Sequence, residues 1–197
     1  MNDAALTPER ILDAAEEVLR RFGPAKATVV DVARALGVSH GAVYRHFPSK
    51  AALRDAVLER WLGRVSAPLA AIATEEGPAT ERLHRWLDML MATKQEKVRG
   101  DPELFATYTS LAGEAREVVA AHVECLVQQV AQIIADGVAR GEFSVADPAD
   151  AARAVIDATA RFHNPIHAAA WADPGIGAAF ERVWALVRRG LGGPTAP

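Results

Sequence analysis

Apolar residues recur at spacings of three and four along nearly the whole chain, and strict alternation of apolar and polar residues is scarce. This period is that of an α-helix with one buried face. Several helix starts are marked by a capping oxygen before a proline that suits a first helical turn, at Thr7-Pro8, Asp101-Pro102, Asp147-Pro148 and Asp173-Pro174. The pattern therefore predicts an all-α protein without strands.

Short helices precede longer ones in this pattern. The first is expected over about residues 8–22, ended by Gly23-Pro24, and the second runs from the cap Thr28 to Leu36, where Gly37 suits a left-handed stop. Later helices are expected over about residues 39–47, 50–65, 79–97, 114–141, 148–162 and 176–191. We therefore predict an N-terminal three-helix domain over residues 1–52 and a larger helical bundle over residues 53–197.

The second and third helices have the pattern of a helix-turn-helix. They are joined by a glycine-containing turn, and the third is short and begins at the cap Ser39. At 3.6 residues per turn, Val43 and Phe47 lie on its inner stripe. The opposite stripe carries small residues that let a helix approach another surface closely, together with one long cation: Gly41, Ala42 and Arg45.

The distribution of charged residues supports an anionic partner for the helix-turn-helix segment, residues 20–50, and not for the rest of the chain. The chain has a net charge of −3, which by itself implies no polyanionic partner. Between Arg20 and Lys50, however, six residues are basic and Asp31 is the only acid.

The single cysteine, Cys125, excludes an internal disulfide and is typical of the cytoplasm. The first ten residues lack a signal peptide's apolar core, and we expect no stretch apolar enough to span a membrane.

In a DNA major groove, such a helix would meet bases with its outward stripe and phosphates with its flanks. Arg45 suits a guanine edge and Ala42 a thymine methyl group. Phosphate oxygens suit the remaining polar side chains, namely Tyr44, His46, Thr28 and Lys50. The alternative is an ordinary short capped helix between two others, which is common in helical proteins and needs no DNA.

The stretch "ATVVDVARALGVSHGAVYRHFPSKAALRDAVL" resembles the N-terminal signature of TetR-family transcriptional regulators. The match covers about residues 8–58 and rests on Thr28, Gly37, Val38, Ser39, Tyr44, Phe47 and Lys50. The resemblance implies phosphate contacts at Thr28, Ser39, Tyr44, His46 and Lys50. It implies base-facing positions at His40, Gly41, Ala42 and Arg45. Many relatives have lysine where this chain has His40, so an affinity that depends on pH is expected.

The resemblance also implies a homodimer, a double-stranded DNA operator and a small-molecule effector. The dimer interface would use the helices over residues 148–162 and 176–191, although ordinary core packing explains the same apolar residues. The effector would lie inside the bundle and release DNA, and its mostly apolar candidate contacts favour an apolar or aromatic molecule. These candidates, each of which core packing also explains, are Trp86, Met89, Leu90, Phe105, Tyr108, Cys125 and Phe162.

No catalytic arrangement stands out, and no cofactor is expected. His163 and His167, with His122 and Cys125, are candidate metal ligands, but Pro165 breaks their spacing, so polar closure of a helix end is the preferred interpretation. The function predicted is therefore an effector-released repressor that is not an enzyme. The competing hypothesis is a helical ligand-binding or interaction protein that no longer reads DNA.

Overall fold

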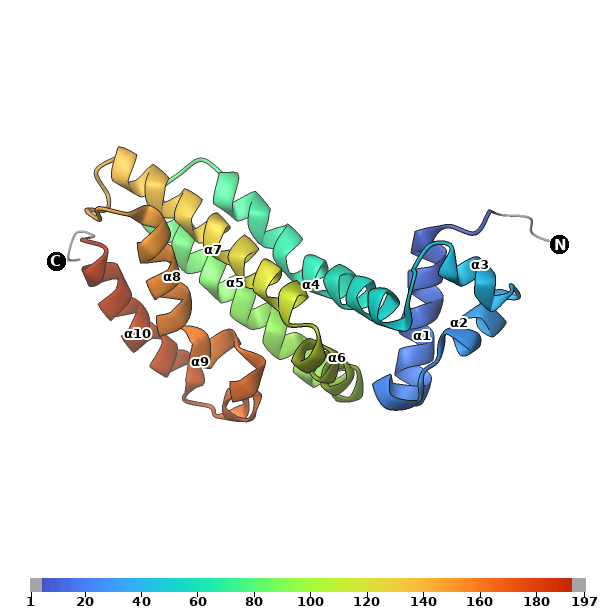
Figure 1. The fold of residues 1–197 in the computed structure, drawn as a ribbon. Coiled ribbons are helices and arrows are strands. Elements are labelled where there is room, and N and C mark those ends of the chain that lie inside the picture. Colours follow the sequence, from blue (N-terminus) through green and yellow to red (C-terminus); the bar gives the residue numbers. More distant parts are fainter. Residues whose placement is uncertain (1–4, 193–197) are drawn as a thin grey trace. The chain divides into compact units, whose positions relative to one another are not determined.

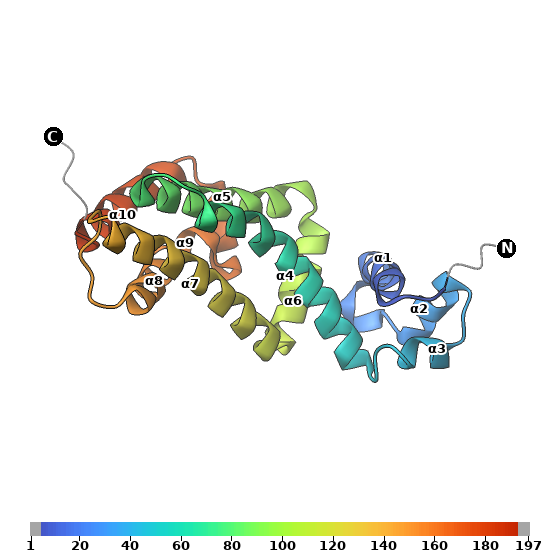
Figure 2. The same cartoon turned by 90° about the horizontal axis from the view of Figure 1, so that it is seen from above.

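The computed structural model describes residues 5–192, which are mostly helical and contain no strand (Figure 1). The all-α prediction is confirmed. Figure 2 shows the same helices from above. In chain order they are α1 (Pro8–Lys26), α2 (Val29–Leu36), α3 (His40–Tyr44), α4 (Lys50–Thr74), α5 (Ala79–Gly100), α6 (Pro102–Glu114), α7 (Arg116–Ala139), α8 (Pro148–Ala158), α9 (Ala160–His163), the 3-10 helix η1 (Pro165–Ala172) and α10 (Ile176–Gly190).

The chain forms two compact units, and each combines segments that are distant in the sequence. The first unit contains Met1–Leu62 and Asp101–Ala120, and the second contains Gly63–Gly100 and Ala121–Pro197. Helices α4 and α7 have residues in both units. The continuous division after residue 52 stays a prediction.

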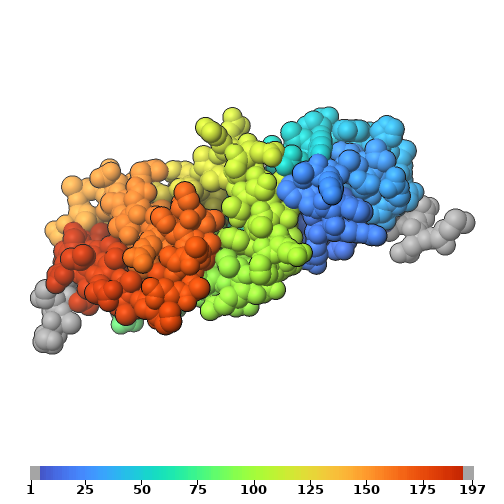
Figure 3. Space-filling view, turned by 90° about the horizontal axis from the view of Figure 1, so that it is seen from below, coloured from blue at the N-terminus to red at the C-terminus, as the bar shows by residue number. Residues whose placement is uncertain are grey.

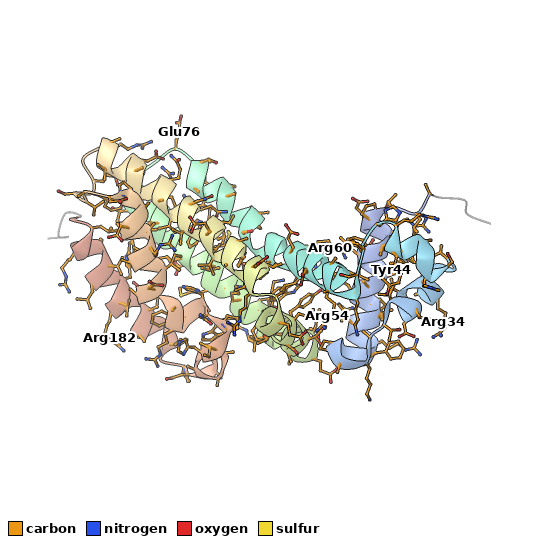
Figure 4. All side chains as sticks on the ribbon, in the orientation of Figure 1. Arg34, Tyr44, Arg54, Arg60, Glu76 and Arg182 are labelled. Atoms are coloured by element: carbon orange, nitrogen blue, oxygen red, sulfur yellow. The ribbon has the colours of Figure 1, made fainter. Side chains whose placement is uncertain are left out.

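The first unit is built around α1, whose apolar stripe packs against α2 and α6. Ile11, Val43 and Val57 are fully buried in this core. Across its edge, Arg60 of α4 pairs with Asp13 at 2.8 Å and with Glu16 at 3.1 Å on α1 (Figure 4). Burial of apolar side chains supplies most of the stability of such a unit. The ion pairs add little stability and connect α4 to one side of α1.

The second unit has a large apolar core, and Arg82 and Lys94 are buried with it. Arg82 is 1% exposed and donates hydrogen bonds from Nε and Nη2 to the carbonyl oxygens of Ile72 and Ala73, near the end of α4. Its guanidinium also pairs with Asp136 of α7 at 3.1 Å. The otherwise unused carbonyls of a helix end thus find a partner, and three helices are joined at one point.

Several helix boundaries differ from the prediction, and α3 ends at Tyr44, three residues earlier than predicted. The predicted helix over 148–162 is broken at Thr159, whose hydroxyl donates to the carbonyl of Val155 at 2.8 Å and so competes with the backbone. Helix α4 continues past Pro68 to Thr74, and η1 was not predicted. The predicted end of the first helix is confirmed as a break at Gly23, where φ is 71°, although a further turn continues to Lys26.

Helix α7 is more apolar than expected. By length and composition it could cross a membrane, since an 18-residue window has a mean hydropathy of 1.5. The expectation that no stretch is this apolar is wrong for α7. A single such helix is weak evidence for a membrane span, because core helices of soluble proteins share these properties, and Val130, Ile133 and Ile134 of α7 are fully buried in the core of the second unit.

Candidate nucleic-acid interface

The start of α2 is held by the predicted capping box. Thr28 is extended, and its Oγ1 accepts from the backbone N–H of Asp31 at 3.2 Å. Asp31 Oδ2 in turn accepts from the backbone N–H of Thr28 at 3.2 Å and from its hydroxyl at 2.6 Å. This hydroxyl bond lowers the pKa of the Asp31 carboxyl, with a smaller contribution from Arg34. The hydroxyl proton of Thr28 is therefore already used within the chain.

The turn between α2 and α3 needs glycine. Gly37 has φ 68° and ψ 28°, and the backbone N–H of Val38 donates to the carbonyl of Ala33 at 3.0 Å. This left-handed stop reverses the chain within three residues, and Ser39 then caps α3 by accepting from the N–H of Ala42 at 3.2 Å. The Ser39 hydroxyl accepts here, so its proton is free for an external acceptor.

Helix α3 exposes most of the predicted DNA contacts. His40, Gly41, Tyr44, Arg45 and His46 are all exposed. Within the described residues, the side chains of Arg45 and His46 make no hydrogen bond or ion pair. The ring of Tyr44 meets that of His40 edge-on at 6.2 Å between centroids. The exposed face thus carries a cation, two imidazoles and a phenol, and within the described residues the side chains of Arg45 and His46 have no polar partner.

Ala42 is a correction to this set. It is 7% exposed, and Val43 beside it is fully buried, so the prediction that Ala42 points outward is wrong. Helix α3 is only five residues long and packs against α2. This packing buries two neighbouring positions of α3, Ala42 and Val43, instead of a single stripe. The burial of Ala42 therefore does not support a contact between Ala42 and a thymine methyl group.

Gly41 stays exposed, and nothing among residues 5–192 requires it to be glycine. A Cβ atom at this position would meet only the hydroxyl of Ser39, at 3.9 Å, which is ordinary contact. Its backbone conformation is helical and open to any residue. The small size of Gly41 therefore has no purpose within its own unit, as expected of a residue at which another molecule approaches the backbone closely.

The predicted effector residues do not form one group. Trp86, Leu90 and Phe162 belong to the core of the second unit, whereas Met89 is 39% exposed. Cys125 is half-buried and accepts from Gln129 Nε2 at 3.6 Å. The remaining two candidates lie in the first unit, where Trp61 stacks on Tyr108 at 4.4 Å and lies near Phe105. Effector contact stays a prediction for each of them.

A cavity of about 440 Å³ lies elsewhere in the first unit. Helix α4 contributes Arg54 to its lining and the end of α6 contributes Glu114, and these two side chains form an ion pair at 2.9 Å (Figure 4). No sequence pattern predicts this contact, because about sixty residues separate Arg54 from Glu114 along the chain. The cavity lining includes none of the predicted effector residues.

The histidines of the second unit have different surroundings. His163 is buried at the end of α9, with Nε2 3.3 Å from the carbonyl oxygen of Ile156, whereas His167 is exposed. His84 was not predicted to have a role, but it lies between Asp88 and Glu181, at 3.1 and 3.2 Å from its two ring nitrogens. These three side chains each offer one ligand atom within 4.8 Å of the others, which is a spacing that could hold a metal ion.

The comparisons with known proteins agree with this geometry. Residues 11–57 match "Bacterial regulatory proteins, tetR family", and residues 79–184 match "Tetracyclin repressor-like, C-terminal domain". An uncharacterised HTH-type transcriptional regulator of Mycobacterium tuberculosis (strain CDC 1551 / Oshkosh) is 32% identical over 105 residues, or 53% of this chain and 50% of that protein. The nucleoid occlusion factor SlmA of Vibrio atlanticus is 33% identical over 84 residues, or 42% and 43%. These alignments thus span half or less of the curated relatives.

Solved structures share the fold over most of the chain. A putative TetR-family regulator from Mesorhizobium loti has a TM-score of 0.68 at 19% identity, covering 93% of this chain and 94% of that one. SmeT, the repressor of a Stenotrophomonas maltophilia multidrug efflux pump, has a TM-score of 0.62 at 21% identity, covering 93% and 87%. The second family match alone covers residues 79–184 of the 197 in the chain. Helix-turn-helix, bundle and sequence match lead to one conclusion: the chain belongs to the TetR family of bacterial regulatory proteins.

Proposed function

We propose that the protein is a transcriptional regulator that binds a palindromic DNA operator as a homodimer and is released by a small-molecule effector. The observation that supports this most is the outer face of α3. It presents Tyr44, Arg45 and His46 with no partner for Arg45 or His46 within the described residues, beside a glycine that the chain itself does not need. The family match supports the same function.

Each exposed side chain has a chemical role in this proposal. Arg45 has a planar fork of donors that matches the two acceptors on a guanine edge, so it reads sequence. Tyr44, His46 and Ser39 donate to phosphate oxygens and set the register of α3 in the groove. Lys50, at the first turn of α4, adds a charge contact, and His40 and Gly41 lie against bases. Thr28 contributes only by exchanging its bond to Asp31 for one to a phosphate.

Two half-sites need two copies of α3, so the proposal includes a homodimer. The two segments predicted to form the interface, residues 148–162 and 176–191, correspond to α8 and α9 and to α10 in the structure. On them, Ala152 and Val155 are buried in the chain's own core, whereas Leu186 of α10 is 63% exposed. Figure 3 shows the surface to which η1 and α10 contribute, in orange and red. The contact with a second copy is inferred from the two half-sites and not from Leu186, since a single exposed leucine is ordinary at a protein surface.

The effector proposal rests on the apolar core of the second unit and on solved structures that share the fold. One of them is SmeT in complex with triclosan, and another is a FadR from Bacillus subtilis in complex with stearoyl-CoA. Such a ligand would stabilise one arrangement of the helices over another and so couple to DNA affinity. A regulator of this kind acts in the cytoplasm, where the DNA is.

The test is binding of purified variants to a duplex that carries the selected operator. Arg45→Ala should relax preference at one base position by about 1–3 kcal/mol. Tyr44→Phe should weaken binding to all duplexes about equally, and wild-type affinity should fall steeply with salt. The matched control is Arg99→Ala, which removes an exposed arginine near the end of α5, away from α3 and from the proposed interface helices. Unchanged base preference in Arg45→Ala, or an equal loss in the control, would contradict the assignment.

A further inference from the structure

A histidine and two carboxylates from distant parts of the chain meet in the second unit. His84 and Asp88 lie one turn apart on α5, and Glu181 lies on α10, 97 positions after His84. Nδ1 of His84 is 3.1 Å from Asp88 Oδ2, and its Nε2 is 3.2 Å from Glu181 Oε1. Among residues 5–192, no other group of three histidine, cysteine, aspartate or glutamate side chains brings its ligand atoms within 4.8 Å of one another. Tertiary packing, rather than local sequence, therefore creates this cluster.

The ring of His84 is held in place by aromatic neighbours. Phe180 and Trp184 of α10 are buried, and their ring centroids lie 5.7 and 5.1 Å from that of His84. The side chain of His84 is 29% exposed, and those of Asp88 and Glu181 are 48% and 60% exposed. The cluster thus combines a fixed imidazole with two carboxylates that ions in solution can reach. A ligand therefore has little ordering of the ring to impose.

These three side chains form the donor set of a transition-metal site. Imidazole nitrogen and carboxylate oxygen are common ligands of Zn²⁺, and an open zinc site has three protein ligands with water in the fourth position. The imidazole also separates this set from the all-oxygen surroundings that Mg²⁺ and Ca²⁺ prefer. Two carboxylates beside a neutral imidazole carry two negative charges, which a divalent cation offsets.

A protonated His84 between the two carboxylates is the alternative for the same groups. In that arrangement both ring nitrogens donate, one to each carboxylate. A metal ion instead takes the place of the proton at one ring nitrogen and draws both carboxylates to it. Bonds of about 2.0–2.2 Å to one ion place its ligand atoms within about 4 Å of each other. Because Asp88 and Glu181 are exposed, rotation of their side chains supplies this movement while the ring stays in place.

We propose that His84, Asp88 and Glu181 bind one divalent transition-metal ion, that Zn²⁺ matches their donors best, and that water completes its coordination. The ion joins α5 to α10. It therefore stabilises the folded second unit relative to the unfolded chain, in which these ligands are not held together. This site goes beyond the proposed regulator function, because reading DNA through α3 does not require it.

Titration calorimetry on the full-length protein tests the proposal with Zn²⁺ and Mg²⁺ as probes. The protein is first treated with EDTA and then freed of the chelator. Zn²⁺ should bind at one ion per chain and at least tenfold more tightly than Mg²⁺. Its affinity should fall roughly tenfold or more in Asp88→Asn and in Glu181→Gln, which keep the size of each side chain and remove its charge. His84→Gln should weaken Zn²⁺ binding in the same way.

Glu76→Gln is the matched control. It removes an exposed carboxylate of the second unit that belongs to neither α5 nor α10, and it should leave the affinity for Zn²⁺ unchanged (Figure 4). Urea unfolding gives a second readout. Saturating Zn²⁺ should raise the urea midpoint of the wild type and of Glu76→Gln, but not that of Glu181→Gln. Circular dichroism without metal verifies that each variant is folded.

The absence of Zn²⁺ binding at millimolar concentration, or equal affinity for Zn²⁺ and Mg²⁺, would overturn the proposal and leave His84 as an ion-paired histidine. Binding that persists unchanged in all three ligand variants would place the ion elsewhere and overturn it as well. An equal loss in Glu76→Gln would show that the effect is one of general surface charge, against the proposal. DNA binding is measured separately in metal-free buffer, so failure of the metal site is distinct from failure of the regulator function.

Discussion

Replacing Lys94 by methionine should stabilise the folded protein, in contrast to most substitutions in a core. Lys94 is 5% exposed and lies on the buried stripe of α5, and methionine has a similar length with no charge. Burial lowers the pKa of Lys94 from the ordinary 10.5 to about 8. That difference of about 2.5 pH units corresponds to roughly 3 kcal/mol, at about 1.36 kcal/mol for each unit.

The sign of this effect depends on pH. A lysine whose pKa is lower in the folded state binds its proton less tightly there, so protonation costs stability. The cost is fully present below about pH 8 and disappears as the pH rises to 10.5. The free energy of unfolding of Lys94→Met should therefore exceed that of the wild type by up to about 3 kcal/mol at pH 7, and the gain should shrink towards pH 10.

Urea unfolding followed by circular dichroism, at one fixed protein concentration, measures this difference between pH 7 and pH 10. Taking the difference between two variants cancels the titration of every other group. Lys97→Met is the control, because it removes the same charge from a less buried place one turn away. A variant that is no more stable than the wild type at pH 7, or a gain that does not change with pH, would refute the reasoning.

Three further changes in the second unit have defined outcomes in the same unfolding assay. Wild-type stability should fall as the pH drops from 6.5 to about 4, since the unfolded state protonates His163 first, and His163→Gln should flatten this slope. Asp136→Ala should cost about 3 kcal/mol or more because it leaves the guanidinium of Arg82 buried without its carboxylate; a loss under 1 kcal/mol would contradict this. Gly137→Ala should cost about 1–3 kcal/mol, because the added Cβ collides with the ring of Phe143, and an unchanged midpoint would show that the ring moves aside freely.

The parts of the fold that could be predicted from sequence are those set by local chemistry. The capping box at Thr28, the left-handed stop at Gly37 and the cap at Ser39 each involve residues within a few positions of one another, and all three are present. The helical period likewise depends only on near neighbours. The break at Thr159 was missed because a threonine hydroxyl bonds to its own helix in some settings and faces water in others.

Contacts between segments that are distant in the sequence could not be predicted from the helical pattern. Ala42 lies on the outward side of a helical wheel, but the packing of α2 against α3 buries it. A helical wheel cannot predict this burial because it describes one helix without its neighbours. The union of residues 101–120 with the N-terminal unit depends on tertiary packing in the same way. Lys94 and Arg82 did leave a signal, because each is a charged residue within the apolar stripe of α5. Such a charge indicates a buried partner or ligand without naming it.

Selection from a pool of random DNA duplexes shows whether the outer face of α3 reads DNA. Purified protein free of bound ligand is incubated with the pool at low salt, and the bound fraction is amplified and sequenced. We expect enrichment of a palindrome whose half-sites share a guanine that Arg45→Ala no longer requires. No enrichment by a folded dimer would contradict it and would favour a helical ligand-binding protein that does not read DNA.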